Sequence, residues 1–368
     1  MKRILQVFAE PILYGGQESA LMNFYRAIDK ENYQFDFFTP FEAENTGMID
    51  EIHALGGEVY NSNKPFESKL RKHYFTTELK KFITAHPYEI VHINSGSSYA
   101  LAHGAKICKN AGIPKVIVHS HASGVESIKH KIVRLLYDPY FIKYPDYCIG
   151  CSNLVAEWKY PKSVLNSDKC RIVYNGIDTE KFAFSEEKKN RKRAELGLTD
   201  EFVLGSVGRL SPEKNPLFTV DVFKKLAEKD PNSKLLMVGN GILKEEVENK
   251  ISEYGLKDRF IHLENRSDVN ELMCAMDAFI VPSEFEGFSI VLVEAQSTGL
   301  SCVCSDAVPE EVKVNSNVKY LSLKTPAELW AEAICNRQNI DRTFASSAMK
   351  ESAFNLNECV KVLEEIYR

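Results

Sequence analysis

Two carboxylates bracket a predicted helix start in the second half of the chain. An apolar run at 279–281 stops at a Pro-Ser pair, which is typical of a buried strand that ends in a turn. Glu286 lies in that turn, and Ser289 precedes a helix predicted over 290–298. Glu294 follows Ser289 by five residues, so it lies just over one turn into the helix and close to the same helix start.

The chemistry of this segment suits a ligand that carries both phosphate and sugar hydroxyls. A helix N-terminus offers backbone N–H groups and the positive end of a dipole, so we expect Gly287, Phe288 and Ser289 to surround an anion. Glu286 and Glu294 are poor phosphate ligands but good acceptors for paired hydroxyls, and a nucleotide sugar combines both groups. The alternative is that Glu286 caps the turn and Glu294 is a solvated helix residue, since short motifs also arise by chance.

A second loop, at 208–215, lies between a predicted strand at 202–207 and a predicted helix at 217–226. Arg209 and Lys214 are both on this loop. A pyrophosphate needs fixed cations, and an arginine can bind two of its oxygens at once. The alternative interpretation is two solvated loop cations.

In the first half of the chain, one predicted strand is followed by a pair of glycines and another ends with two histidines. The strand at 3–8 is followed by Gly15–Gly16, which either brings backbone amides close to a ligand or forms an ordinary turn with positive φ. The strand at 115–121 ends with His119 and His121, which alternate and therefore share one face. Ligands of doubly wound sheets bind outside the carboxyl ends of the strands. Any single histidine can equally be a satisfied core or surface side chain.

Length and composition narrow the class of protein. The chain has 368 residues, of which 44% are hydrophobic and 26% charged, as expected for two soluble globular domains. Its net charge of −5 argues against nucleic acid as a partner. The first apolar run is too short for a signal peptide, and no stretch approaches the length of a transmembrane helix. Nine scattered cysteines are typical of a reducing cytoplasm, and we interpret Cys148-Ile-Gly-Cys151 as a strand and turn rather than a metal site.

The segment with Glu286 and Glu294 resembles the Glu-x7-Glu motif of the retaining glycosyltransferases of family 4, and Pro282-Ser283 before it fits the same pattern. The resemblance covers nearly the whole chain, because the Gly-Arg-x-x-x-x-Lys-Asn loop at 208–215 and the Asn-Gly-Ile-Asp turn at 175–178 also match. Within this family, the chain most resembles bacterial enzymes that build capsular, exopolysaccharide or O-antigen chains.

The resemblance implies the fold and its division. The expected fold class is α/β of the GT-B type, with two doubly wound, Rossmann-like parallel-sheet domains facing across a cleft. We expect an acceptor-side domain at 1–180 plus 350–368 and a donor-binding domain at 181–349. Residues 185–193 are charged and poor in apolar residues, as linkers are.

The resemblance also implies the roles of single residues. His121 would contact the transferred sugar, with His119 in reserve, and Glu286 would be catalytic beside that sugar. Arg266 marks the loop beside the nucleotide base, although the family's usual glycine before it is Asn265 here. The expected donor-binding residues are Gly15, Gly16, Arg209, Lys214, Gly239, Arg266, Glu286, Gly287, Phe288, Ser289 and Glu294.

We expect transfer of a hexosyl unit from a nucleotide sugar, UDP- or GDP-linked, to a hydroxyl of a glycan or a lipid-linked oligosaccharide in surface polysaccharide biosynthesis. The resemblance implies that the stereochemistry is retained. The chain contains no Asp-x-Asp, so we expect no metal and no other cofactor. The alternatives are a sugar-nucleotide epimerase, which would show no acceptor dependence, a phosphorylase, and a non-catalytic two-domain sugar-binding protein, which would normally be exported.

One further segment, Ser127–Tyr144, interleaves basic residues with aromatic and aliphatic ones, and Lys69–Ala85 is a predicted helix with a basic face. Both would suit loose contact with an anionic membrane surface. The alternative for Ser127–Tyr144 is an amphipathic core helix that is broken at Pro139. We therefore expect a cytoplasmic protein that contacts the inner face of the cell membrane peripherally.

Overall fold

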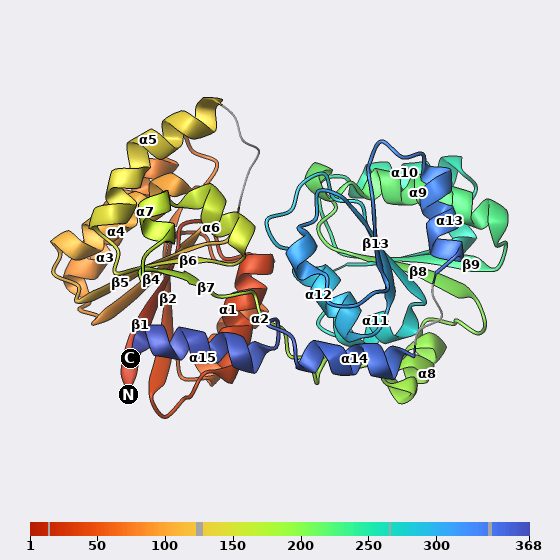
Figure 1. The fold of residues 1–368 in the computed structure, drawn as a ribbon, viewed down its shortest axis with the longest axis horizontal. Helices are drawn as coiled ribbons and strands as arrows, with labels where there is room; N and C mark the ends of the chain where they lie inside the picture. The colour runs from red at the N-terminus through yellow and green to blue at the C-terminus, as the bar shows by residue number, and fades with distance from the viewer. Residues whose placement is uncertain (14, 123–127, 265, 338–340) are drawn as a thin grey trace. The chain divides into compact units, whose positions relative to one another are not determined.

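Two parallel β-sheets organise the chain, one in each of two units (Figure 1). The computed structural model describes residues 1–13, 15–122, 128–264, 266–337 and 341–368. The first unit comprises Met1–Gly176 and Leu356–Arg368, and the second comprises Ile177–Asn355. Both sheets are covered by helices, which confirms the predicted α/β class with two Rossmann-like sheets.

The sheet of the first unit has seven parallel strands in the order β3-β2-β1-β4-β5-β6-β7. Its central strands read as apolar runs because both faces are covered, and all nine residues of the second strand are buried. The strands are β1 (Lys2–Phe8), β2 (Tyr33–Phe41), β3 (Val59–Lys64), β4 (Ile90–Ser95), β5 (Lys115–Ser120), β6 (Tyr147–Gly150) and β7 (Cys170–Ile172).

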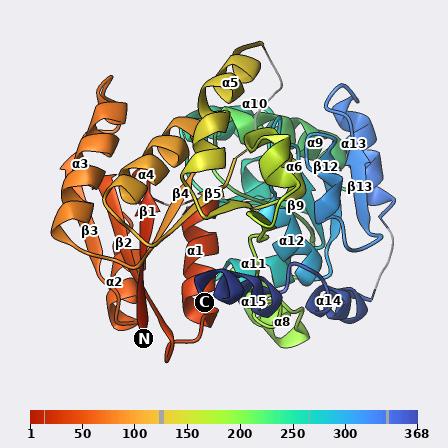
Figure 2. The same cartoon turned by 60° about the vertical axis from the view of Figure 1, so that its left-hand side comes forward.

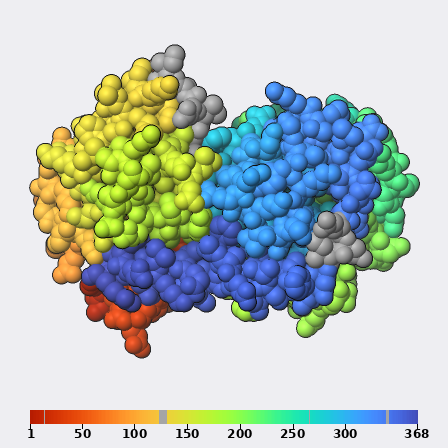
Figure 3. Space-filling model, viewed as in Figure 1, coloured from red at the N-terminus to blue at the C-terminus, as the bar shows by residue number. Residues whose placement is uncertain are grey.

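Helices form a layer on each face of this sheet. One layer contains α1 (Gly16–Ala27), α2 (Thr46–Ala54) and α15 (Leu356–Tyr367), which share a hydrophobic core with β1 and β2. The other contains α3 (Arg71–Ala85), α4 (Ser98–Asn110), α5 (Ile128–Lys143), α6 (Asn153–Lys159) and α7 (Lys162–Leu165). Within this second layer α3, α4 and α5 lie side by side (Figure 2). The C-terminal helix α15, dark blue in Figure 3, forms part of the surface of this unit.

The sheet of the second unit has six parallel strands in the order β10-β9-β8-β11-β12-β13. They are β8 (Phe202–Val207), β9 (Ser233–Val238), β10 (Phe260–Leu263), β11 (Ala278–Val281), β12 (Ser301–Ser305) and β13 (Val318–Leu321). A hydrophobic core packs one face against α9 (Pro216–Lys229), α10 (Lys244–Glu253) and α13 (Ala327–Cys335). The remaining helices are α8 (Glu186–Glu195), α11 (Val269–Ala275), α12 (Ile290–Ser297) and α14 (Arg342–Lys350).

The segment predicted as a linker at 185–193 is instead the start of helix α8, so that prediction was wrong. The Ser185 hydroxyl caps the helix by accepting the amide of Lys188. The helix is held by a buried charged side chain rather than by apolar ones, because Arg193 donates to the carbonyl oxygens of Ala275 and Glu201 at 3.0 and 2.6 Å. An apolar-poor sequence therefore concealed an ordered helix.

Helix α5 continues through Pro139, so the predicted break there was also wrong. Proline removes one backbone N–H, which would otherwise donate to the carbonyl oxygen four residues earlier, at Leu135. Leu135 is 78% exposed, so water can satisfy that carbonyl. Ser127 of the segment lies outside the described residues. Within the described parts of the chain, no helix is long and apolar enough to cross a membrane.

Candidate active site

The turn between β11 and α12 contains Glu286, as the sequence predicted. The turn is anchored because the Phe288 ring packs against the ring of Phe354, with centroids 5.6 Å apart. Glu286 is only 6% exposed. Ser289 is also buried, and its hydroxyl neither caps α12 nor hydrogen-bonds any other described residue. The start of α12 therefore has no side-chain cap of its own, which is what an anion-binding helix start needs.

Lys214 holds the buried Glu286 carboxylate. Its Nζ lies 2.5 Å from Glu286 Oε1, and the Ser283 hydroxyl donates to the same oxygen at 3.0 Å. The two loops are also joined through the backbone, since the Glu284 amide donates to the carbonyl of Glu213 at 2.9 Å. A buried carboxylate needs a partner charge, and this lysine supplies it. Two residues from separate predicted loops thus belong to one cluster.

Two other predicted donor-binding residues lie on neighbouring loops of the same sheet edge. Arg209 follows β8, and its side chain is 64% exposed, with Nη2 3.5 Å from Glu213 Oε1. Gly239 follows β9 with a φ of +138°. A Cβ at Gly239 would collide with the backbone carbonyl oxygen of Gly208. Gly239 is therefore required for the close approach of the two loops.

Glu294 is half-buried, so the assumption that it is an exposed, solvated helix carboxylate was wrong. Its neighbours Leu292 and Val293 are fully buried, which keeps this part of α12 against the core. Burial raises the pKa of Glu294 to about 8. Near neutral pH the carboxyl is mostly protonated, so it can donate one hydrogen bond as well as accept others.

Arg266 is tied to the next helix start. Its Nε and Nη2 donate to the two carboxylate oxygens of Asp268 at 2.7 and 2.6 Å. Lys192 donates to the same carboxylate at 2.6 Å. These hydrogen bonds hold the pKa of Asp268 well below its usual range. A guanidinium held by its edge keeps its flat face open for stacking. Asn265 lies outside the described residues.

In the first unit, His121 is the last member of a buried hydrogen-bond network that begins in the C-terminal helix. The Tyr367 hydroxyl accepts the Gln6 amide at 3.0 Å and pairs with Nδ1 of His92 at 2.7 Å. The Asn94 amide donates to Gln6 Oε1 at 3.0 Å, and Asn94 Oδ1 pairs with His121 Nε2 at 3.1 Å. Tyr367, Gln6, His92 and Asn94 are each 0% exposed.

This network sets the tautomer of His121. Because the Asn94 amide nitrogen donates to Gln6, its Oδ1 can only accept, so His121 carries its proton on Nε2. Burial lowers the pKa of His121 to about 3, so the ring is neutral. Its Nδ1 is then a lone-pair acceptor, and the Asn175 side chain is its polar neighbour. The reserve candidate His119 is fully buried, with its ring 4.1 Å from that of His121.

The Gly15–Gly16 loop starts helix α1. Gly15 has a φ of −152° and Gly16 is the first helical residue, so the alternative of a turn with positive φ was wrong. Glu18 in the first turn accepts the amide of Leu13 at 3.1 Å. The loop thus places a helix start at the carboxyl end of β1, as the ligand-binding interpretation requires.

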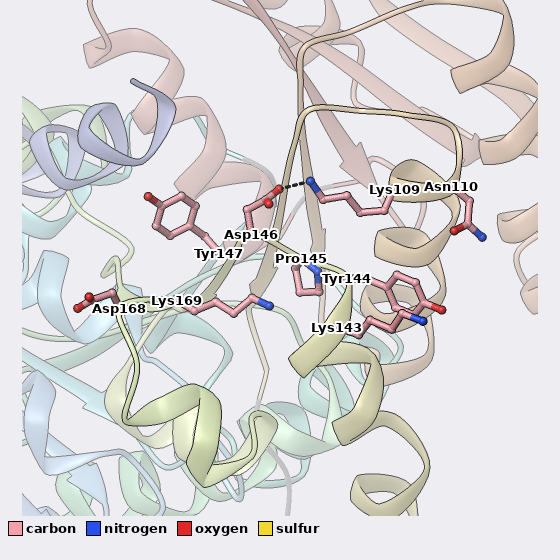
Figure 4. Close-up of a pocket in the computed structure, with 9 residues that line it drawn as sticks. All are labelled: Lys109, Asn110, Lys143, Tyr144, Pro145, Asp146, Tyr147, Asp168 and Lys169. Carbon is pink, nitrogen blue, oxygen red and sulfur yellow. Dashed lines mark ion pairs between the residues drawn. The ribbon is translucent and has the colours of Figure 1, made fainter.

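An open hollow of about 570 Å³ lies elsewhere in the first unit (Figure 4). Its lining includes Tyr147 and Lys169, which lie at the amino ends of β6 and β7. Lys169 donates to the carbonyl of Ile142, and Lys109 pairs with Asp146 at 2.6 Å. The hollow is at the opposite edge of the sheet from His121, and its engaged lysines give it no evident part in the site.

Sequence reasoning missed several of these residues. Gln6 is a polar residue inside an apolar strand, which is a signal that could have marked it. Tyr367 carries no such signal, whereas Ser283 belongs to the Pro-Ser pair of the motif but was given no contact with Glu286. Cys148 and Ile149 form a buried strand as predicted, and within the described ranges no group of three or more His, Cys, Asp or Glu side chains is arranged to hold a metal.

Comparison with known proteins shows the family to which the chain belongs. The model of the "Glycosyltransferase Family 4" domain matches residues 14–181, and that of "Glycosyl transferases group 1" matches 188–336. EpsF of Bacillus subtilis, which is named as a glycosyltransferase, is 27% identical over all of this chain and 96% of its own length. The Escherichia coli UDP-Gal:α-D-GlcNAc-diphosphoundecaprenol α-1,3-galactosyltransferase is 30% identical over 83% of this chain and 79% of its own.

Solved structures agree on the fold. The crystal structure of Anabaena Alr3699/HepE in complex with UDP superimposes with a TM-score of 0.77 at 19% identity, over 100% of this chain and 99% of that one. WaaG, a glycosyltransferase of lipopolysaccharide biosynthesis, superimposes with a TM-score of 0.73. The protein therefore belongs to the family 4 glycosyltransferases and has the GT-B fold.

Proposed function

We propose that the protein transfers a hexosyl unit, with retention, from a nucleotide sugar to a hydroxyl of a glycan or lipid-linked saccharide in surface polysaccharide biosynthesis. The observation that carries this proposal is the buried Glu286 carboxylate, paired with the half-buried Lys214 beside the uncapped start of α12. An inert turn has no need to bury a carboxylate. A UDP-linked donor is favoured over a GDP-linked one, because the names of the Escherichia coli and Anabaena relatives specify UDP.

Each group then has a chemical task. The acceptor hydroxyl oxygen bonds to the anomeric carbon, while the bond from that carbon to the phosphate oxygen breaks and leaves its electron pair on the diphosphate. Arg209, Lys214 and the start of α12 neutralise that charge, so no metal is required. The departing phosphate takes the acceptor proton. Glu286 and the neutral His121 orient the sugar, and Glu294 binds the ribose hydroxyls.

A panel of nucleotide sugars with and without a lipid-linked N-acetylglucosamine diphosphate tests this function. We expect one donor to be consumed faster when the acceptor is present. Glu286→Gln should lower kcat about 10²-fold by misplacing the anomeric carbon, whereas Glu294→Gln should mainly raise the donor KM. Glu284→Gln is the matched control, because Glu284 is an exposed carboxylate of the same turn. An acceptor-independent epimer product would support the epimerase instead.

We also propose that the α3–α5 layer contacts an anionic bilayer, where lipid-linked acceptors lie. Five residues at helical spacing on α5 face solvent and form an apolar stripe, Ile132, Leu135, Leu136, Pro139 and Ile142. Helix α5 is at the surface of its unit in Figure 3 (yellow). The sequences of α3, α4 and α5 carry ten lysines and arginines but only two carboxylates. That balance fits an anionic surface better than a neutral protein partner.

Flotation with vesicles that contain an anionic lipid tests this contact. We expect the protein to float at low salt and to be released at high salt, since each basic side chain adds about 1 kcal/mol that salt screens. The double variant Leu135→Ser, Leu136→Ser should float less. If the wild-type protein does not float, the membrane proposal is wrong and the transferase proposal remains.

A further inference from the structure

A second polar cluster lies at the carboxyl edge of the first sheet and takes no part in the His121 network. Glu10 follows β1, Ser95 ends β4, and Lys159 ends α6, which follows β6. The Ser95 hydroxyl oxygen accepts the amide of Ser97 at 2.9 Å, so its proton is directed to Glu10 Oε1 at 2.6 Å. One oxygen of the carboxyl group is therefore fully engaged by the protein.

The other oxygen of Glu10 is left without a partner. Glu10 Oε2 is buried and makes no hydrogen bond among the described residues. Lys159 is only 2% exposed, and its Nζ donates to the Gly96 carbonyl at 2.6 Å and the Ser98 hydroxyl at 3.3 Å. These are two hydrogen bonds for a group with three N–H donors, and the ammonium also lies over the Trp158 ring, 4.7 Å from its centroid. No ion pair within 4 Å joins Lys159 to Glu10 in the described structure, although each lies in the electrostatic field of the other.

Burial favours the uncharged form of both Glu10 and Lys159. It raises the pKa of Glu10 to about 7 and lowers the pKa of Lys159 to about 8. Glu18 and Arg71 are the other charged groups that act on Glu10. A buried carboxyl with one idle oxygen is unfavourable for folding. Such a group is typical of a site where stability has been given up for function.

The chemistry of the cluster selects the ligand. A carboxylate oxygen seeks a donor, and the spare N–H of an ammonium seeks an acceptor. A hydroxyl both donates and accepts, so a sugar hydroxyl can donate to the idle oxygen of Glu10 while the nearby positive charge of Lys159 favours the carboxylate form. A free phosphate is a poor fit because the Glu10 carboxylate would repel it.

We propose that Glu10, held by Ser95 and assisted by Lys159, binds a hydroxyl of the acceptor sugar through Oε2. This inference rests on the proposed transferase function and names the residues that recognise the acceptor. The contact orients the acceptor and moves no proton, since the departing phosphate takes it.

The test compares Glu10→Gln with Glu31→Gln, whose exposed carboxylate lies just before β2 at the opposite edge of the sheet. The probes are UDP-glucose, UDP-galactose and UDP-N-acetylglucosamine as donors, a short-chain N-acetylglucosamine diphospholipid as acceptor, and free UDP for calorimetry. We expect Glu10→Gln to lower kcat/KM for the acceptor about 10- to 100-fold, with its affinity for UDP retained. Glu31→Gln should match the wild type.

A melting curve at pH 8 separates binding from a structural role. The raised pKa of Glu10 means that its ionised form destabilises the folded state as the pH rises through about 7. Glu10→Gln should therefore melt at or above the wild-type temperature at pH 8. If Glu10→Gln has the acceptor kinetics of the wild type, or if this variant clearly loses thermal stability, the inference about Glu10 is wrong and the proposed transferase function remains. If the wild-type protein transfers sugar from none of the three donors to this acceptor, the proposed function fails and the inference with it.

Discussion

Removal of the Tyr367 hydroxyl should destabilise the first unit far more than a single hydroxyl ordinarily does. Tyr367→Phe leaves the Gln6 amide and Nδ1 of His92 without partners, and both side chains are 0% exposed. An unsatisfied buried polar group costs about 1–3 kcal/mol, so the two together should lower the free energy of unfolding by roughly 2–4 kcal/mol after some relaxation. The ring is retained, so no cavity larger than one oxygen atom forms.

The chain offers a matched control on the same helix contact. The Tyr33 hydroxyl donates to the carbonyl of the half-buried Glu364 at 3.4 Å, although the Tyr33 residue is only 6% exposed. Its bond is long and water can replace it, so Tyr33→Phe should cost less than about 0.5 kcal/mol. The difference in the free energy of unfolding between the two variants therefore reports the contribution of the buried network, with the effect of losing a hydroxyl subtracted.

Urea unfolding followed by tryptophan fluorescence is the assay. The chain has two tryptophans, Trp158 in the first unit and Trp330 in the second. In a Trp330→Phe background the remaining indole reports on the first unit alone. With an m-value of about 1–3 kcal/mol/M, Tyr367→Phe should lower the midpoint by about 1 M. A midpoint within 0.2 M of that of Tyr33→Phe would refute the assignment of a continuous buried network.

Three further outcomes are expected. Arg209→Ala should weaken binding of a nucleoside diphosphate about 10- to 100-fold in calorimetry, because it removes a charge-assisted contact and the carboxylate that pairs with Arg209, that of Glu213, is 3.5 Å away. Unchanged affinity would remove Arg209 from the site. Full transfer in excess EDTA is expected, and loss of activity that Mg²⁺ restores would contradict the metal-free leaving-group assignment. The raised pKa of Glu294 predicts stability that is present below pH 4 and lost as the pH rises through 8. Glu294→Gln should therefore gain roughly 1–2 kcal/mol over the wild type between pH 5 and pH 9 in urea melts, and equal curves would argue against burial of this carboxyl.

Local pattern was enough for most of the framework. Strands with a buried centre are short apolar runs, so the strand at Phe202–Val207 was predicted with the bounds that the structure has, and its residues Val203, Leu204 and Gly205 are buried. Loops at 208–215 and 282–289 were recognised because glycine, proline and charge interrupt the apolar pattern. Where local pattern and tertiary contacts disagree, as in α8 and at Pro139, the prediction failed, since a buried arginine or a solvated carbonyl leaves no trace in hydrophobic periodicity.

The sequence by itself determined the α/β class, the two-sheet organisation and the family, because apolar periodicity and motif spacing are properties of neighbouring residues. It also placed Glu286 and Lys214 on loops that follow strands, and His121 at the carboxyl end of a strand. Only the tertiary structure decided what those side chains touch. Lys214 and Glu286 are 72 residues apart, and Gln6 and Tyr367 are 361 apart. Contacts over such separations depend on how the strands order themselves in the sheet and which helix returns to cover it. The pairing of Glu286, the tautomer of His121, the burial of Glu294 and the idle oxygen of Glu10 all follow from that packing.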